Sequence, residues 1–403
     1  MLNQMHRQDS EEYALVTLNE QIGPMGDCTA NFEDQSINVF GGIPGEEVQV
    51  RIVRYRRRRK QMISGIVSEV IKPSQHRVKP PCAYFGKCTG CQWEHIGYDY
   101  QLVLKREYVV RELGMYPSLR EVNVDETIGT SDLYGYRNHA RFTVRKSGTP
   151  GFVNRITRQF VEIDRCLLMT AGINRLLSKL AGRAQETSQL SIRYGVNTDQ
   201  WLVQPKLDNT EISFDSGQTH YSELLSNHMF KIGSPSFFQV NTSQAEVLGS
   251  LVRESLDLRG DETIVDAYAG VGTFAILLAD SASRVIAIEE SDSAVKDAKI
   301  NAEGIHNIEF QLGKTEEVLR TLNTRPDAVV LDPPRSGCHP ATIDEVLHWL
   351  PDRTVYVSCD PTALGRDLDI LVRGGLQVQT VSPIDMFPQT HHVETLAVLA
   401  PSV

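Results

Sequence analysis

Two residues near the end of the sequence, Cys359 and Glu394, are of the types that perform covalent and general base catalysis. Cys359 lies in Ser358-Cys359-Asp360-Pro361, directly after an apolar stretch, and Glu394 closes the polar segment Met386–Glu394. A thiolate forms a covalent bond to an electron-poor carbon, and a carboxylate removes a proton from the adduct. An isolated cysteine is more often a small buried apolar residue. The place of Cys359 at the end of a strand favours the reactive role.

A glycine-containing segment, Val265–Ala275, indicates where a nucleoside would bind. An apolar strand leads into Gly270 and Gly272 and then into a helical stretch. Glycines let the backbone approach a ligand, and the N-terminus of a helix presents free N–H groups. Glu289, at the end of the next strand, is placed to hold ribose hydroxyls. Both nicotinamide dinucleotides and S-adenosylmethionine (SAM) are bound by this arrangement, and Gly270-x-Gly272-x-x-Ala275 also satisfies the dinucleotide fingerprint.

The turn Asp332-Pro333-Pro334 follows another apolar strand and favours SAM. Methyltransferases that act on nucleobases commonly place an acidic–Pro–Pro turn beside the methyl group, and nicotinamide enzymes have no general need for it. Carbon 5 of uracil is too weak a nucleophile to accept a methyl group unaided. A thiolate that adds to carbon 6 activates carbon 5, and a base must then remove the carbon 5 proton. Cys359 and Glu394 beside a methyl donor would supply both groups.

Three further cysteines indicate a metal site. Cys82, Cys88 and Cys91 fall within ten residues, and Cys166 downstream is a possible fourth ligand. Thiolates at such spacing bind zinc or an iron–sulfur cluster, and the spacing alone does not decide between the two.

The composition favours a cytoplasmic protein. An odd count of 7 cysteines along 403 residues is not a disulfide framework. No apolar run reaches the roughly 18 residues of a membrane span, and the first residues lack the apolar core of a secretory signal. The formal net charge is −10, but Arg51–Lys60 is a dense basic run that could bind a polyanion such as RNA. Nothing indicates a membrane or an obligate protein partner.

The expected elements divide the chain into three parts. Residues 13–71 read as a small barrel of the OB type, because short strands alternate with glycine and proline turns. The strands expected there are Ala14–Thr17, Ile37–Phe40, Val48–Arg54 and Ile63–Ile71. A mixed region follows, with a helix near Tyr100–Leu113 and strands at Ala140–Val144 and Leu190–Tyr194.

From about residue 232 onward, apolar strands alternate with helices, which predicts a Rossmann-like, doubly wound parallel sheet with an antiparallel edge. The expected strands are Thr263–Ala267, Arg284–Ile288, Asn307–Leu312, Ala328–Leu331, Val355–Ser358, Gln377–Val381 and Thr395–Ala400. The expected helices are Thr273–Leu278, Ser293–Glu303, Lys314–Asn323, Ala341–Leu350 and Leu364–Val372.

Taken together, these motifs resemble the RNA (uracil-5-)-methyltransferase family, which makes 5-methyluridine in tRNA and ribosomal RNA. The resemblance covers almost the whole chain. The early strands resemble the TRAM domain, an RNA-binding OB-type barrel. Pro80-Pro81-Cys82, Cys88-Thr89-Gly90-Cys91 and Arg165-Cys166-Leu167 resemble the members that carry a [4Fe-4S] cluster. The resemblance therefore selects iron–sulfur over zinc, with a role in folding and RNA recognition.

The resemblance also assigns site residues. Ser234–Asn241 is similar to the start of the family's catalytic domain, where Gln239 would contact SAM and Phe237 would lie near the target base. The other residues implied to line the SAM pocket are Tyr268, Gly270, Gly272, Thr273, Glu289 and Asp332. Ser358–Asp367 matches the nucleophile motif, and His392-Val393-Glu394 matches the general base segment. Many members have Asn where Asp360 stands, so a second carboxylate would lie near the thiol.

The expected organisation is a tail over residues 1–10, a TRAM/OB-type barrel over 11–72, a central α+β domain with the cluster over 73–230, and a SAM-dependent methyltransferase domain over 231–403. The expected reaction is methylation of carbon 5 of a uridine, in ribosomal RNA rather than tRNA, through a Cys359–carbon 6 adduct, with Glu394 as base. Three alternatives stay open: a non-catalytic RNA-binding or RNA-folding protein with the same domains, a nicotinamide oxidoreductase, and a cytosine-5 methyltransferase.

Overall fold

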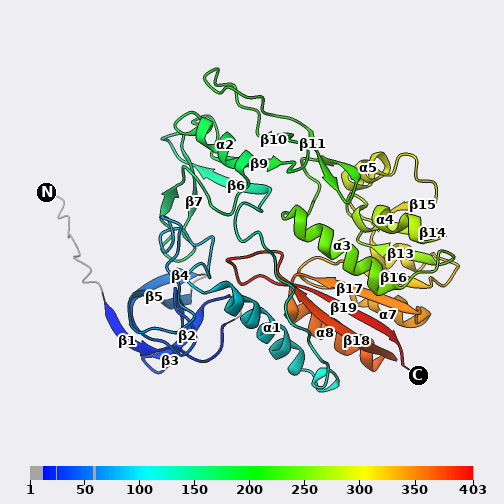
Figure 1. The fold of residues 1–403 in the computed structure, drawn as a ribbon, viewed down its shortest axis with the longest axis horizontal. Helices are drawn as coiled ribbons and strands as arrows, with labels where there is room; N and C mark the ends of the chain where they lie inside the picture. Colours follow the sequence, from blue (N-terminus) through cyan, green and yellow to red (C-terminus); the bar gives the residue numbers. More distant parts are fainter. Residues whose placement is uncertain (1–11, 24, 58–59, 403) are drawn as a thin grey trace. The chain divides into compact units, whose positions relative to one another are not determined.

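The computed structural model describes residues 12–23, 25–57 and 60–402. The chain forms two compact units. Unit 1 comprises the residues up to Gln101 together with Phe152–Val161 and Gln389–His391, and unit 2 comprises Leu102–Gly151, Glu162–Pro388 and the residues from His392 onward. Figure 1 shows the course of the chain within each unit.

Unit 1 contains a curled, half-barrel sheet of five strands in the order β1-β4-β5-β3-β2. The strands are β1 (Tyr13–Thr17), β2 (Cys28–Phe32), β3 (Gln35–Phe40), β4 (Glu47–Arg57) and β5 (Lys60–Lys72). Neighbouring strands run antiparallel except β3 and β5, which are parallel. The four expected strands are confirmed, and β2 is an additional strand. Two residues of the basic run Arg51–Lys60 that was expected to bind RNA, Arg58 and Arg59, lie outside the described residues.

A central sheet has the strand order β10-β9-β6-β7-β8. Its strands are β6 (His139–Val144), β7 (Pro150–Val153), β8 (Phe160–Glu162), β9 (Gln189–Tyr194) and β10 (Trp201–Gln204). The helix α2 (Ala171–Leu180) packs on β9. The helix α1 (Tyr98–Gly114) and the 3-10 turn η1 (Pro117–Leu119) come before this sheet in the chain, and β11 (His220–Leu225) and β12 (His228–Gly233) form a hairpin after it. The expected α1, β6 and β9 are confirmed.

The remainder of unit 2 is a seven-stranded sheet in the order β15-β14-β13-β16-β17-β19-β18. Its strands are β13 (Thr263–Ala267), β14 (Arg284–Glu289), β15 (Ile308–Leu312), β16 (Ala328–Leu331), β17 (Arg353–Ser358), β18 (Leu376–Ile384) and β19 (Glu394–Pro401). Strands β13 to β17 are parallel, and β19 runs antiparallel to both β17 and β18. The predicted Rossmann-like sheet with an antiparallel edge is confirmed.

Helices cover both faces of this sheet. Successive residues of a strand point to opposite sides, so these apolar strands present apolar side chains on both faces. The helices are α3 (Thr242–Leu256), α4 (Thr273–Leu278), α5 (Asp292–Asn301), α6 (Thr315–Leu319), α7 (Pro340–Trp349) and α8 (Pro361–Arg373), and η2 (Ala279–Ser281) is a 3-10 turn. Ile264 belongs to the core shared with α3 and α4, and its neighbour Val265 belongs to the core shared with α1, α7 and α8. Figure 1 shows α3 on the opposite side of the sheet from α8. The strand order reverses between β13 and β16, which is where ligands bind in such folds.

No helix within the described part of the chain is long and apolar enough to cross a membrane.

Candidate active site

Cys359 lies in a rigid turn between β17 and α8. Asp360 caps α8, because its Oδ1 accepts hydrogen bonds from the N–H groups of Thr362 and Ala363 at 3.0 and 3.3 Å. The Asp360 N–H donates to Ser358 Oγ at 3.2 Å. The residues on both sides of the thiol are thus fixed.

Glu394 is the first residue of β19 and lies next to Cys359. Ser358 at the end of β17 is directly opposite Thr395 in the antiparallel pair. One further step along this ladder brings Cys359 beside Glu394, and their charges are close enough to affect the Cys359 pKa. Glu394 is only 5% exposed. The structure therefore brings the predicted nucleophile and the predicted base together.

Burial and neighbouring carboxylates make both groups hard to ionise. Burial raises the pKa of Cys359 to about 11, and the carboxylates of Glu394, Asp332 and Asp360 add to this effect. Burial, reinforced by Asp332, also raises the pKa of Glu394 well above its usual range. Arg335 opposes both shifts. The thiol is therefore protonated at neutral pH when the site holds only the protein's own groups.

Arg335 is a site residue to which sequence reasoning assigned no role. It follows the turn Asp332-Pro333-Pro334, and its guanidinium is the positive charge that acts on both the thiol and Glu394. Its position in the sequence, directly after the Asp332-Pro333-Pro334 turn, was the one feature that could have indicated a role in the site. A positive charge at this place favours the ionised forms of Cys359 and Glu394.

The Asp332 loop is held against α8 by a buried carboxylate. Asp367 of α8 is fully buried and accepts hydrogen bonds from the Cys338 N–H at 2.8 Å and the Tyr356 hydroxyl at 2.6 Å. Arg366 Nε donates to the other oxygen of Asp367 at 2.8 Å. Because Cys338 ends the loop that begins at Asp332, this network ties the loop to the helix that follows Cys359. Burial raises the pKa of Asp332 to about 7.

The glycine loop lies at the carboxyl end of β13. Gly270 and Gly272 have φ values of 56° and 86°, which is the left-handed region that favours glycine. A Cβ on Gly270 would meet nothing within 4 Å, so the backbone faces open space there. Glu289 accepts hydrogen bonds from the Gly270 N–H at 2.9 Å and the Ser291 N–H at 2.8 Å. The loop and the carboxylate expected to bind ribose are therefore adjacent.

Asp266 is a second residue that sequence reasoning left without a role. It is fully buried in β13, and its Oδ2 accepts a hydrogen bond from the Ala275 N–H at 2.8 Å. Its Oδ1 has no hydrogen-bond partner among the described residues. Burial raises the Asp266 pKa to about 7, and Asp332 and Glu289 add to the shift. A buried oxygen without a partner beside a glycine loop fits a polar ligand.

The other residues predicted to contact a cofactor lie around this loop. Tyr268 is half-buried, and its hydroxyl donates to Thr342 Oγ1 at 3.3 Å, so the tip of its side chain is directed to α7. Thr273 is the first residue of α4 and is half-buried. Gln239 lies in the segment before α3, and its carbonyl accepts from Asn138 Nδ2 at 3.0 Å.

Several buried groups hold the segment that carries Phe237 and Gln239. Arg193 donates to the Ser236 carbonyl at 2.6 Å, and Asp297 accepts from the Ser236 hydroxyl at 2.6 Å. Asn241 caps α3 by accepting from the Gln244 N–H. Phe237 is nonetheless 67% exposed. A large aromatic ring on a fixed backbone and in contact with solvent suits stacking on a base.

The cysteines predicted to bind a cluster lie in different units. Cys82, Cys88 and Cys91 belong to unit 1 and Cys166 to unit 2. All four are free and half-buried. Burial raises the pKa of Cys88, and the neighbouring Cys82 adds to the shift. Among the described residues, no group of three or more metal-binding side chains is assembled. The iron–sulfur cluster and its zinc alternative therefore stay predictions.

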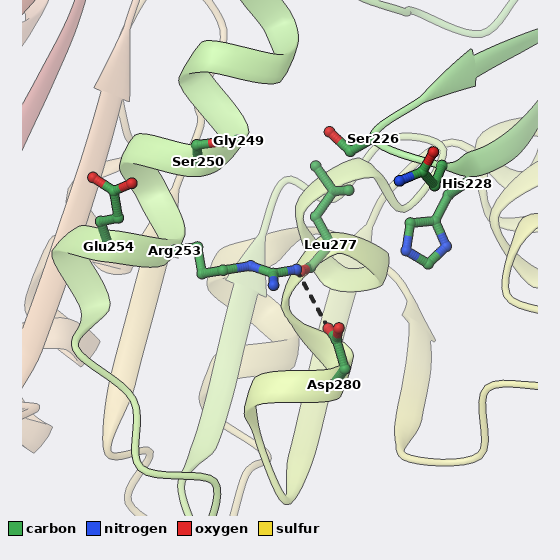
Figure 2. Close-up of a pocket in the computed structure, with 9 residues that line it drawn as sticks. Ser226, His228, Gly249, Ser250, Arg253, Glu254, Leu277 and Asp280 are labelled. Carbon is green, nitrogen blue, oxygen red and sulfur yellow. Dashed lines mark hydrogen bonds and ion pairs between the residues drawn. The ribbon is translucent and has the colours of Figure 1, made fainter.

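A hollow of about 490 Å³ lies elsewhere in unit 2 and contains none of the predicted site residues. Figure 2 shows that Arg253 of α3 extends across it to Asp280, with which it forms an ion pair at 3.3 Å. Arg253 also donates to the Leu277 carbonyl. Arg253 thus connects α3 to the end of α4, which is a structural role.

Comparisons with known proteins give a consistent result. Residues 222–401 match the family model described as tRNA (Uracil-5-)-methyltransferase. An uncharacterized RNA methyltransferase of Nostoc sp. is 30% identical over 98% of this chain and 97% of its own length. Another, from Gloeobacter violaceus, is 33% identical over 93% of both chains. The crystal structure of Pyrococcus abyssi tRNA (uracil-54, C5)-methyltransferase with S-adenosyl-L-homocysteine covers 96% of this chain and 100% of its own, with a TM-score of 0.75 and 25% identity.

Proposed function

Because the chain belongs to the RNA (uracil-5-)-methyltransferase family, we propose that it transfers a methyl group from SAM to carbon 5 of a uridine in RNA through a covalent Cys359 adduct. The observation that carries this proposal is the position of Cys359 beside Glu394 at the facing ends of β17 and β19. One group forms the bond to carbon 6, and the other removes the carbon 5 proton. The same pair has no use in a protein that only binds RNA.

SAM supplies the methyl group, and the residues around the glycine loop fit it. Gly270 leaves open space where a side chain would stand, and the Asp266 Oδ1 has no partner among the residues described. Glu289 would accept hydrogen bonds from ribose hydroxyls, and Asp332 would face the positive sulfonium. Gln239, Tyr268, Gly272 and Thr273 complete the proposed site. The Pyrococcus abyssi structure, which holds S-adenosyl-L-homocysteine, supports a SAM-type ligand in this fold.

The protein's own groups then account for each step. The Cys359 thiol loses its proton to water, and Sγ bonds to carbon 6 while the carbon 5–carbon 6 electrons move toward the carbon 4 oxygen. Carbon 5 would then bond to the methyl carbon of SAM as the methyl–sulfur bond breaks, which leaves S-adenosyl-L-homocysteine. Glu394 removes the carbon 5 proton, the double bond re-forms and the Sγ–carbon 6 bond breaks. The target base must leave its stack so that Sγ can reach carbon 6 from one face.

The charges of the site couple ligand binding to activation. Burial raises the pKa of both Cys359 and Glu394. Three carboxylates add to the shift of Cys359, and one of them, Asp332, adds to that of Glu394. A positive charge bound beside Asp332 offsets these carboxylates, and Arg335 acts in the same direction. The thiolate and the Glu394 carboxylate therefore become available chiefly when the methyl donor is present.

RNA recognition is proposed to involve the whole chain. The barrel over residues 11–72 would bind RNA, the central domain over 73–230 would hold a [4Fe-4S] cluster on Cys82, Cys88, Cys91 and Cys166, and residues 231–403 would catalyse the reaction. The half-barrel sheet of unit 1 and the position of Cys82 near Cys88 support the first two points. Ribosomal RNA is the proposed target class, and tRNA is the alternative that the Pyrococcus abyssi enzyme represents.

Trapping the adduct tests this proposal. RNA in which 5-fluorouridine replaces uridine cannot lose a proton from carbon 5 after methylation, so the covalent complex persists. We expect a protein–RNA band that survives denaturing electrophoresis with wild-type protein and SAM, in the ribosomal or the tRNA pool. The band should be absent with Cys359→Ala. A band of equal strength with Cys359→Ala would contradict the assignment of the nucleophile.

A further inference from the structure

One face of the central sheet in unit 2 is polar and carries positive charge. Alternate residues of β6 and β9 point to opposite sides, and Ala140, Phe142, Leu190 and Ile192 are buried on one side. The opposite side carries polar and positively charged side chains. On β6 these are His139, Arg141 and Thr143, and their directly paired residues on β9 are Arg193, Ser191 and Gln189.

Arginines dominate the charge of this face. Arg141 is exposed, and it forms no ion pair with any residue that the structure describes. Burial lowers the pKa of His139 to about 3, and the nearby charges of Arg193, Arg137 and Arg141 add to this shift. The three arginines therefore give this face a positive potential, which an anion bound there would offset.

The face is hollowed where these residues lie. A hollow of about 520 Å³ lies over β6, β9 and β10. Its polar lining residues are Arg141, Thr143, Gln189, Ser191, Gln204 and Ser234, with no acidic side chain among the lining residues. One arginine with hydroxyls and amides is the set of groups that proteins use to bind phosphate and sugar oxygens of nucleic acids.

The hollow borders the segment that displays Phe237. Ser234 lines the hollow and begins this segment. Arg193, at the edge of the polar face, donates to the Gly233 and Ser236 carbonyls at 3.3 and 2.6 Å. Phe237 is only three residues after Ser234 in the chain, and its ring is exposed. A strand of RNA bound in the hollow would therefore lie close to this ring.

We propose that the polar face of β6, β9 and β10 binds the phosphate backbone of the RNA substrate next to the target uridine, with Arg141 as its main contact. This inference rests on the proposed function, because the RNA is the substrate of that reaction. Charge complementarity selects RNA phosphates as the occupant.

Binding of a labelled oligouridylate about 20 nucleotides long to the full-length protein tests this surface, because backbone contacts are independent of sequence. Arg141→Gln should weaken binding roughly fivefold to tenfold and reduce the slope of log K against log salt by about 0.7. The matched control is Arg320→Gln, which removes one positive charge at the end of α6, where Arg320 pairs with Glu345. The control should bind RNA as wild type does.

Steady-state kinetics distinguish a role of Arg141 in RNA binding from a role in protein stability alone. Arg141→Gln should raise the KM for RNA by a similar factor, with kcat at saturating RNA and SAM affinity unchanged. Equal RNA affinity and equal salt slope for Arg141→Gln and Arg320→Gln would overturn the inference, and so would a wild-type protein that does not bind the oligouridylate at low salt. If wild type binds RNA through Arg141 but methylates no RNA, the proposed function fails while the RNA-binding surface stands.

Discussion

Cys359 and Glu394 lie one step beyond the directly opposed residues Ser358 and Thr395, at the facing ends of the antiparallel strands β17 and β19. The two strands belong to one sheet, so backbone hydrogen bonds hold together the strand ends from which Cys359 and Glu394 extend. Glu394 is buried and Cys359 is half-buried. Burial raises the pKa of both groups, and the Glu394 carboxylate adds to the shift of the Cys359 thiol. The proposed nucleophile and the proposed base therefore lie close together, in surroundings that disfavour the ionised form of each.

Glu394→Gln should halt the reaction after methyl transfer. Glutamine has nearly the same shape but cannot accept the carbon 5 proton, so the Cys359–RNA bond cannot be released. We expect turnover to fall roughly 100-fold or more and a covalent RNA–protein complex to accumulate on denaturing gels. Glu303→Gln, a change at an exposed residue in the turn after α5, serves as the control and should form no such complex. Normal turnover by Glu394→Gln would show that another group is the base.

Asp360→Asn should shift the pH dependence of methylation to lower pH. Burial is the main cause of the raised Cys359 pKa, and the Asp360 carboxylate adds to it. Asparagine removes that charge while keeping the oxygen that caps α8. The thiolate then forms at lower pH, so kcat at neutral pH should rise roughly twofold or more. A pH–rate profile at saturating RNA and SAM measures the shift. Asp360→Ala, which also loses the cap, should be less stable by about 1 kcal/mol. A profile of Asp360→Asn that moves to higher pH would contradict this account.

Lys105→Met should destabilise the protein strongly. Lys105 of α1 and Asp385, in the segment after β18, form a fully buried ion pair, and Lys105 Nζ also donates to the Phe387 carbonyl at 3.2 Å. Removal of one partner leaves a buried charge without compensation, at a cost of about 3–5 kcal/mol in the free energy of unfolding. Denaturant unfolding measures this cost.

The matched control for this ion pair is Lys296→Met, which removes the exposed pair with Asp292. That change should alter the free energy of unfolding by less than about 1 kcal/mol. Joint replacement by Lys105→Met and Asp385→Leu should recover most of the lost stability, because no charge is then buried alone. Equal small losses for Lys105→Met and Lys296→Met would refute the importance of the buried pair.

The metal content of the purified protein tests the prediction that the four cysteines bind an iron–sulfur cluster. Protein purified without oxygen should contain iron and acid-labile sulfide and show the broad visible absorption of an iron–sulfur cluster. Cys88→Ala should lose this absorption, whereas Cys28→Ala should keep it, because Cys28 is a fully buried core residue of β2. Protein that contains zinc and no iron would show that the other metal predicted from the spacing is correct.

The sheet of unit 2 was largely predictable from the sequence. Buried parallel strands are continuous apolar runs bounded by turns, so β13, β16 and α4 were predicted with the bounds that the structure shows. In contrast, β2 was missed, because its sequence Cys-Thr-Ala-Asn-Phe has small residues on its buried side. The cap residue Asn241 and the spacing of Ala245, Leu248 and Val252 did signal α3, but they were not interpreted as a helix.

The candidate site was predictable in its residue types but not in its geometry. Motifs at strand ends indicated Cys359, Glu394, Asp332 and Glu289. The register that sets Ser358 opposite Thr395 depends on long-range pairing, which local sequence does not encode. The role of Arg335 depends on the position of its loop relative to the thiol, and the open oxygen of Asp266 depends on burial. These relationships required the structure.

The most direct test of the central claim is nucleoside mass spectrometry on unmodified tRNA and large-subunit ribosomal RNA, each incubated with SAM and either wild-type protein or Cys359→Ala. The account predicts new 5-methyluridine in one RNA pool with wild type, the ribosomal pool being expected. It also predicts none with Cys359→Ala, which should bind SAM as wild type does. Formation of 5-methyluridine by Cys359→Ala, or of 5-methylcytidine by wild type, would contradict the account.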